Sequence, residues 1–195
     1  MDAARLPLVL ASASPRRLDL LARLGITPAR VIATDIDATP LKAEVPRALA
    51  ARLSRAKAEA AVLLAEGAMI MAADTVVGVG RRILPKGETE ADARHCLALL
   101  SGRRHCVTTG VVLALPDGRR LQRLVETNVT FQRLTDAQME DYIASGEWQG
   151  KAGAYGIQGR AEAFTRFISG SHSNVVGLPL FETAQMLRGI GWLKP

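Results

Sequence analysis

The segment that most constrains how this chain can fold is residues 68–79, which read Ala-Met-Ile-Met-Ala-Ala-Asp-Thr-Val-Val-Gly-Val. Apolar side chains occupy both alternating sets of positions along it. That pattern is typical of a strand buried on both faces. The segment therefore predicts a central strand of a sheet.

Strands and helices are expected to alternate along the rest of the chain. Strands are predicted near residues 8–11, 29–34, 106–115, 121–134 and 163–168, and helices near residues 15–24, 47–66, 89–101, 135–145 and 179–188. The turn sequence Pro116-Asp117-Gly118 joins the two long β-rich segments, which favours an antiparallel pair. This alternation predicts a mixed α/β fold, and 195 residues suit a single domain over residues 1–195.

Residues 8–25 have the sequence of a strand, a tight turn and an amphipathic helix. Ser14 stands at the N-cap position and Pro15 at the first helical position. Arg16 and Arg17 follow in the first turn, where the helix dipole disfavours cations by about 0.3–1 kcal/mol each. Helix N–H groups, serine hydroxyls and guanidinium groups together favour an anion site, and a polyphosphate would offset that cost. The alternative is two solvated arginines on a helix that starts at the surface.

Asp74 is the sharpest candidate for chemistry, because it is the only charged residue within residues 67–80. A carboxylate in a buried strand is costly unless it is paired, hydrogen-bonded or metal-bound, and such residues often mark functional sites. Thr75 adds a hydroxyl beside it. In an extended segment Asp35 and Asp37 share a face, and with Asp74 they could hold Mg²⁺ or Mn²⁺. The alternative for Asp74 is an aspartate at the exposed end of a strand. The alternative for Asp35 and Asp37 is a solvated loop.

Three further side chains are candidates for ligand binding. Lys57 is the only lysine in the helix predicted at residues 47–66, and Lys86 follows a proline in a turn. Each is either an ordinary surface lysine or a partner for phosphate. Gln158 lies in the glycine-rich residues 151–159 and offers an amide donor and acceptor to a base edge. The alternative for that segment is a flexible surface loop.

The net charge of +6 invites a nucleic-acid interpretation, but aromatic residues make up only 4% of the chain and the basic residues are scattered. Platforms for base stacking are therefore scarce, and nucleic acid is a less favoured partner than a small polyanion. Cys96 and Cys106 form no disulfide framework, which favours a reduced, cytoplasmic setting. No run approaches the ~18 apolar residues of a membrane span, and the start of the chain does not resemble a signal peptide.

Taken together, several segments resemble the Maf (septum-formation-protein-like) family of nucleoside triphosphate pyrophosphatases. They follow the family's order and cover nearly the whole chain: residues 10–17, 35–37, 73–77, 99–102, 151–159 and 175–180. The resemblance implies an elongated mixed sheet flanked by helices, with two lobes around a deep cleft, similar to inosine triphosphate pyrophosphatases. It implies hydrolysis of a nucleoside triphosphate to the monophosphate and pyrophosphate with a divalent metal, Mg²⁺ or Mn²⁺, and a homodimer as a family-level expectation.

The resemblance also assigns roles to individual residues. Asp74 matches the family's proposed catalytic base, and Asp37 matches an acidic position near the metal. Positions that line the family's phosphate cleft are matched by Ser12, Arg16, Arg17, Lys57 and Lys86, with Ser14 in the same N-terminal turn. The Gly-Ile-Gln-Gly form of residues 156–159 is that of members acting on dTTP and UTP, with modified pyrimidine nucleotides as further candidates. Arg17, Thr75 and Gln158 fall at positions tied to that preference.

One departure from the family pattern concerns Lys86. The usual context of this lysine is Lys-Pro, whereas here it is Pro85-Lys86-Gly87, so the reach of Lys86 to a phosphate needs testing. The expected mechanism is attack of water on the α-phosphorus with Asp74 as general base. The competing hypothesis, from another class, is a non-catalytic regulator of cell division that binds nucleotide or nucleic acid.

Overall fold

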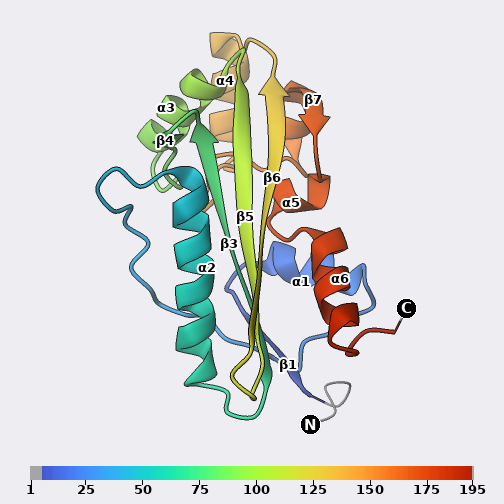
Figure 1. Cartoon of the computed structure of the whole chain (residues 1–195). Coiled ribbons are helices and arrows are strands. Elements are labelled where there is room, and N and C mark those ends of the chain that lie inside the picture. The colour runs from blue at the N-terminus through green and yellow to red at the C-terminus, as the bar shows by residue number, and fades with distance from the viewer. Residues whose placement is uncertain (1–5, 195) are drawn as a thin grey trace.

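A computed structural model describes residues 6–194, and Figure 1 shows one sheet whose three longest strands run through most of the molecule. Within these residues the sheet has seven strands in the order β2-β1-β3-β5-β6-β7, and β4 pairs with β3 outside this path. The strands are β1 (Leu8–Ala11), β2 (Arg30–Val31), β3 (Met69–Val79), β4 (Arg82–Ile83), β5 (Arg104–Ala114), β6 (Arg120–Phe131) and β7 (Thr165–Ser169). The predicted central strand and the predicted antiparallel pair of long strands are both confirmed.

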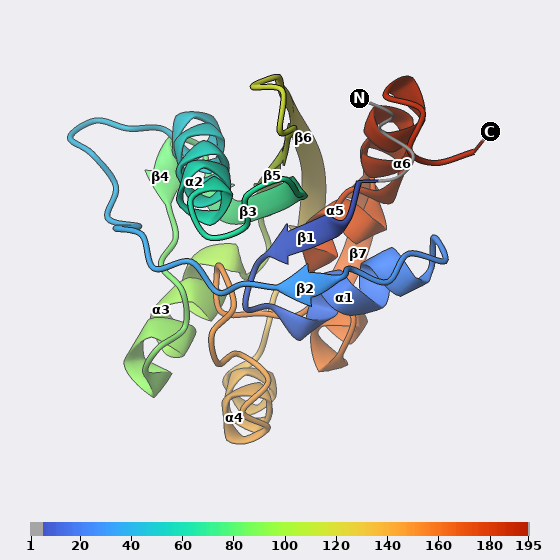
Figure 2. The same ribbon diagram turned by 90° about the horizontal axis from the view of Figure 1, so that it is seen from below.

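Helices cover both faces of this sheet, so the predicted mixed α/β fold is confirmed. The helices are α1 (Pro15–Ala22), α2 (Pro46–Val62), α3 (Glu90–Leu100), α4 (Asp136–Ala144), α5 (His172–Val176) and α6 (Leu180–Gly189). Figure 2 shows α2 on one face and α1, α5 and α6 on the other. No helix in the described part of the chain is both long and apolar enough to cross a membrane.

Local sequence explains where several helices begin. Thr89 and Asp92 form the capping box of α3, and Thr135 and Gln138 form that of α4. In each box the threonine hydroxyl accepts the N3 backbone N–H, and the N3 side chain accepts the N–H of the cap residue. Both boxes were readable in the sequence because their members are only three residues apart.

Other local predictions were wrong in extent. The strand predicted at residues 29–34 is only Arg30–Val31, an edge strand whose one neighbour is the four-residue β1. The segment predicted as a strand at residues 163–168 begins as a 3₁₀ helix, Arg160–Phe164, and the strand follows at Thr165–Ser169. The loop predicted at residues 169–174 contains the start of α5. Ser14 stands at the N-cap of α1, but its side chain makes no capping hydrogen bond.

The sheet has a break beside the middle of β3. One side of β3 pairs with β5 from Ile70 to Gly78. On the other side, β1 pairs in parallel as far as Ala72, and β4 pairs again only at Gly78 and Val79. Within residues 6–194, the stretch 73–77 of β3 therefore has no strand beside it on that side. Asp74 and Thr75 lie in this break.

The side chains of β3 alternate between two packed faces. Met71 and Ala73 pack into a core with α1 and α6, whereas Val77 packs into a second core with α3 and α4. Thr75 lies on the same face between these two cores, since strand side chains alternate with period two. Asp74 faces the other way, toward α2, between the apolar groups around Ala72 and Val76. At the break in the sheet, a polar side chain therefore interrupts the apolar packing on each face of β3.

Small residues bring α2 close to the sheet. Ala50, Ala58 and Ala61 of this helix are fully buried. A Cβ atom at Gly110 of β5 would lie 2.5 Å from the Ala50 carbonyl oxygen. Glycine is therefore required there for the helix to pack as it does. This close packing carries Lys57 of α2 to the carboxylate of Asp74.

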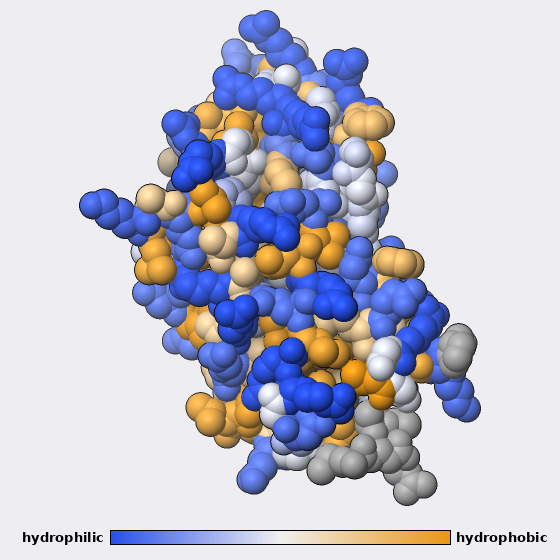
Figure 3. Space-filling view, viewed as in Figure 1, coloured by the Kyte–Doolittle hydropathy of each residue, from blue (hydrophilic) through white to orange (hydrophobic). Residues whose placement is uncertain are grey.

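The outer surface is different: Figure 3 shows polar side chains spread over the visible face, with apolar residues in small patches between them.

Candidate active site

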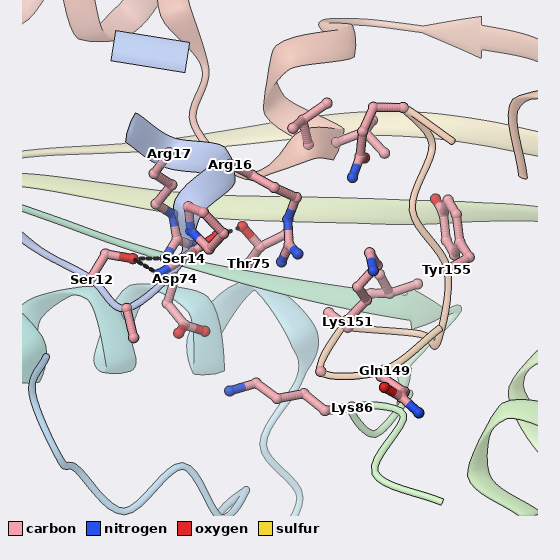
Figure 4. A pocket seen from close by; sticks show the side chains of 18 of the residues that line it. Ser12, Ser14, Arg16, Arg17, Asp74, Thr75, Lys86, Gln149, Lys151 and Tyr155 are labelled. Atoms are coloured by element: carbon pink, nitrogen blue, oxygen red, sulfur yellow. Dashed lines mark hydrogen bonds between the residues drawn. The ribbon is translucent and has the colours of Figure 1, made fainter. Parts of the chain in front are cut away.

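A pocket of about 360 Å³ opens at the break in the sheet. It is bounded by the turn after β1, the first turn of α1, β3 and the loop at residues 149–152. Figure 4 shows the side chains of Arg16, Asp74 and Lys86 directed toward the same space. Nearly all of the site residues predicted from the sequence line this pocket, namely Ser12, Ser14, Arg16, Arg17, Lys57, Asp74, Thr75, Lys86 and Gln158.

Asp74 is buried and paired with Lys57. Its residue is 4% exposed, and Lys57 Nζ donates to Asp74 Oδ1. Burial lowers the pKa of Lys57, and the negative charge of Asp74 opposes that shift. The pair comes from α2 and β3, so the packing of the helix on the sheet supplies the counter-charge. A carboxylate that would be costly alone is thereby accommodated.

Arg17 joins three segments of the chain. Its Nε donates to the Gly177 carbonyl oxygen at 2.8 Å, and its two terminal nitrogens donate to Ser12 Oγ at 2.9 Å and Thr75 Oγ1 at 3.3 Å. The residue is 7% exposed, and burial lowers the pKa of its guanidinium, opposed by the charge of Asp74. A solvated Arg17 is therefore excluded. Arg16 is half-buried, and burial lowers its pKa as well.

Ser12 has its hydroxyl oriented by two donors. Its Oγ accepts from Arg17 and from the backbone N–H of Ser14 at 3.2 Å. A hydroxyl oxygen has two lone pairs and one hydrogen, so both lone pairs of Ser12 are engaged. Its hydrogen remains to be donated to a ligand in the pocket. An anionic oxygen is the natural acceptor.

Lys86 reaches the pocket despite its altered sequence context. Its backbone forms an isolated antiparallel bridge with Ala152, and Gly87 forms a parallel one with Gln149. A Cβ atom at Gly87 would lie 2.8 Å from the Trp148 carbonyl oxygen, so this close pairing requires glycine there. The turn Pro85-Lys86-Gly87 is thus held against the loop on the far side of the pocket.

Three pocket residues with polar side chains were not identified from the sequence as site residues. Gln149 comes from the loop before the glycine-rich segment, whereas Lys151 and Tyr155 lie within that segment. Burial and the nearby charge of Arg16 lower the pKa of Lys151. The Tyr155 hydroxyl lies 2.8 Å from Nε2 of the buried His105. Lys151 begins the glycine-rich segment, which was a usable signal, whereas nothing in the sequence marked Gln149.

Asp37 is not brought into this pocket. It is exposed, and its Oδ1 accepts the Thr39 N–H at 2.9 Å. Hydrogen bonds from the Thr39 side chain and from this N–H lower the pKa of Asp37. The neighbouring Ala38 and Thr39 line a second pocket of about 310 Å³ that shares Asp74 and Lys86. Among residues 6–194, no three His, Cys, Asp or Glu side chains cluster as a metal site. The role of Asp37 as a metal ligand stays a prediction.

The pocket has a strong excess of positive charge. Five cationic side chains and one carboxylate line it: Arg16, Arg17, Lys57, Lys86, Lys151 and Asp74. Such a cluster suits a small ligand with several negative charges. Fold and pocket together define an α/β protein with a cationic pocket, suited to a polyanion, around one buried carboxylate.

The chain belongs to the Maf family. The family model described as Maf-like protein matches residues 7–190. The chain is 62% identical to a dTTP/UTP pyrophosphatase of Granulibacter bethesdensis, over 95% of this chain and 94% of that protein. It is 61% identical to a dTTP/UTP pyrophosphatase of Novosphingobium aromaticivorans, over 94% of this chain and 92% of that protein. Among solved structures, a nucleoside-triphosphatase (dITP/XTP pyrophosphatase) from Mycobacterium abscessus is similar over 65% of this chain and 73% of that chain, with 16% identity and a TM-score of 0.43. The family predicted from the sequence is thus confirmed.

Proposed function

We propose that this protein hydrolyses nucleoside triphosphates, with dTTP and UTP as preferred substrates, to the monophosphate and pyrophosphate. The observation that carries the proposal is the buried Asp74 carboxylate, which lines a pocket together with five cations. The similar proteins of Granulibacter and Novosphingobium, both called dTTP/UTP pyrophosphatases, support the same reaction.

The pocket offers the groups that a triphosphate needs. Ser12 has a hydroxyl hydrogen free for a phosphate oxygen, as its two accepted hydrogen bonds require. Arg16, Lys86 and Lys151 supply positive charge at the same pocket. In the reaction these cations stabilise the negative charge that develops on the departing pyrophosphate.

Asp74 is the proposed general base. It orients a water molecule and takes its proton as the water oxygen attacks the α-phosphorus and the bond to the bridging oxygen breaks. Lys57 holds the carboxylate in place and compensates its charge before the substrate binds. A general base of this kind contributes about 10²–10⁴-fold to a rate.

Base preference is assigned to Gln158, Thr75 and Arg17. Gln158 and Thr75 line the pocket, and Arg17 donates to Thr75. The amide of Gln158 can pair with a pyrimidine edge through one donor and one acceptor. Modified pyrimidine nucleotides are included among the proposed substrates, because they can carry the same hydrogen-bond donor and acceptor on the edge of the base.

A divalent metal, Mg²⁺ or Mn²⁺, is proposed to enter with the substrate. Mg²⁺ is commonly held by one or two carboxylates together with substrate phosphates. The donor set fits this mode, since Asp74 is the one carboxylate lining the pocket and Asp37 lies on the loop beside the adjoining pocket. When bound, the metal would polarise the phosphoryl group.

The proposed setting is the cytoplasm, with a nucleotide as the ligand and a homodimer as the assembly. Nucleic acid is not a proposed partner, because these cations gather around one pocket of about 360 Å³, a size that suits a small polyanion.

The test is an incubation of the protein with Mg²⁺ or Mn²⁺ and a panel of dTTP, UTP, CTP, GTP, ATP and 7-methyl-GTP, with pyrophosphate resolved from orthophosphate. We expect pyrophosphate from dTTP and UTP. Release from other nucleotides alone would retain the chemistry and reject the specificity. Nucleotide binding without turnover, from folded protein, would support the non-catalytic regulator instead.

A further inference from the structure

A series of hydrogen-bonded polar groups leads from the pocket into the interior behind Thr75. Thr75 Oγ1 lies 2.9 Å from Oγ1 of Thr109, its directly opposed neighbour on β5. Thr109 Oγ1 in turn donates to the backbone carbonyl oxygen of Asn174 in α5 at 3.0 Å. At the pocket end of this series, Arg17 donates to Thr75. Thr109 itself is fully buried and does not line the pocket.

The direction of each hydrogen bond in this series is fixed. The Asn174 carbonyl oxygen can only accept, so the single hydroxyl hydrogen of Thr109 is used there. Thr109 must then accept from Thr75, and the single hydrogen of Thr75 is used in turn. Thr75 also accepts from the Arg17 guanidinium, which has only donors. One lone pair of Thr75 remains, and no hydrogen.

We propose that Thr109 is a positioning residue that makes Thr75 a hydrogen-bond acceptor toward the nucleoside part of the substrate. This inference rests on the proposed function and deepens it. The group that Thr75 accepts from is an N–H of the base or an O–H of the sugar, because a fully ionised triphosphate carries no donor. Ser12, on the same pocket, has the opposite polarity and offers a hydrogen to phosphate.

The position of Thr109 favours this role over a purely structural one. Opposed threonines on antiparallel strands often stabilise a sheet by themselves. Here, however, the pair lies between two apolar cores and continues to a guanidinium and a helix carbonyl rather than ending at the sheet. Valine has nearly the shape of threonine but no hydroxyl. In Thr109→Val the Thr75 hydrogen loses its acceptor and is free to turn into the pocket, where it would meet the donor of the substrate.

The experiment measures binding of the non-hydrolysable analogue α,β-methylene-dTTP, whose bridging carbon adds no hydrogen-bond donor, by calorimetry, together with the kinetics of dTTP hydrolysis. We expect Thr109→Val to raise the Kd of the analogue and the KM of dTTP about three- to tenfold, the effect of one misdirected hydrogen bond, with kcat little changed. The affinity for inorganic tripolyphosphate should stay the same, since that ligand has no nucleoside. Thr109→Ser should behave as the wild type.

The matched control is Thr108→Val, the same change at the adjacent buried position on the opposite face of β5. It should alter neither ligand's affinity. A 2′,3′-dideoxythymidine form of the analogue then identifies the donor. If the effect of Thr109→Val persists with it, the donor is the base N–H, and if the effect disappears, the donor is the sugar hydroxyl.

A double-mutant cycle with Thr75→Val gives the decisive result, because residues that act through one another are non-additive. In the Thr75→Val background, Thr109→Val should weaken analogue binding no further. Additive losses, an equal loss of tripolyphosphate affinity, or wild-type binding by Thr109→Val would overturn the inference. Thr109→Ala replaces Thr109→Val if the valine variant does not fold. Analogue binding without release of pyrophosphate from dTTP by the wild type would overturn the proposed function alone.

Discussion

Replacing Asp74 by asparagine removes the charge that compensates Lys57, so it tests the proposed base and the proposed ion pair together. Breaking a buried pair by removing one partner costs about 3–5 kcal/mol. The Lys57 side chain is 16% exposed, so some contact with water remains and we expect a loss of about 2–3 kcal/mol in the free energy of unfolding. The loss has an upper limit, because Lys57 can lose its proton. From its ordinary pKa of 10.5, this costs about 5 kcal/mol at pH 7.

The measurements are urea or thermal unfolding and pyrophosphate release. For a domain of this size the expected loss corresponds to a fall of about 4–12 °C in Tm, and turnover of dTTP should drop at least about 10²-fold. The pH dependence has a definite sign. The folded variant binds a proton at Lys57 less readily than the unfolded chain does, so its deficit should shrink as the pH rises toward about 10.

A second substitution separates stability from catalysis. Adding Lys57→Met to Asp74→Asn removes the uncompensated buried charge and should restore most of the stability without restoring activity. Glu59→Gln, which removes an exposed carboxylate from the same helix, is the control and should change neither. An active Asp74→Asn variant would refute the general-base role. A double variant no more stable than Asp74→Asn would refute the argument from the ion pair.

Three further predictions concern binding, pH and packing. Lys151→Met should raise the KM of dTTP about three- to tenfold at low salt, because it removes a cation from the pocket, whereas Lys42→Met on an exposed loop should not. Burial lowers the pKa of His105 from 6.5 to about 4, so the unfolded chain binds more protons than the folded protein between these pH values. The free energy of unfolding therefore falls as the pH drops through this range, by about 2 kcal/mol at pH 5. His105→Phe should remove that part of the pH dependence in urea unfolding at pH 5 and 7. Gly110→Ala should destabilise by about 1–3 kcal/mol, because its Cβ would collide with α2, while Gly189→Ala, with open space around it, should be neutral or slightly stabilising.

Features that depend on near neighbours in the sequence were predicted correctly. The central strand followed from the apolar residues 68–79, and the starts of α3 and α4 followed from capping boxes spanning three residues. Asp74 was identifiable because a lone charge in an apolar strand needs a partner or a function. The boundaries of β2 and β7 were wrong, since the length of an edge strand depends on its neighbour in the sheet rather than on its own residues.

The tertiary structure alone decided how these parts act together. Lys57 meets Asp74 because α2 lies close to β3, and Arg17 meets Gly177 across 160 positions in the sequence. The polarity of Thr75 depends on Thr109, which is its neighbour only through the register of β3 and β5. The sequence by itself determined the family, most of the elements and most of the residues that line the pocket. Which charge each side chain meets, and which hydrogen each hydroxyl has to offer, are set by contacts between segments that no local pattern encodes.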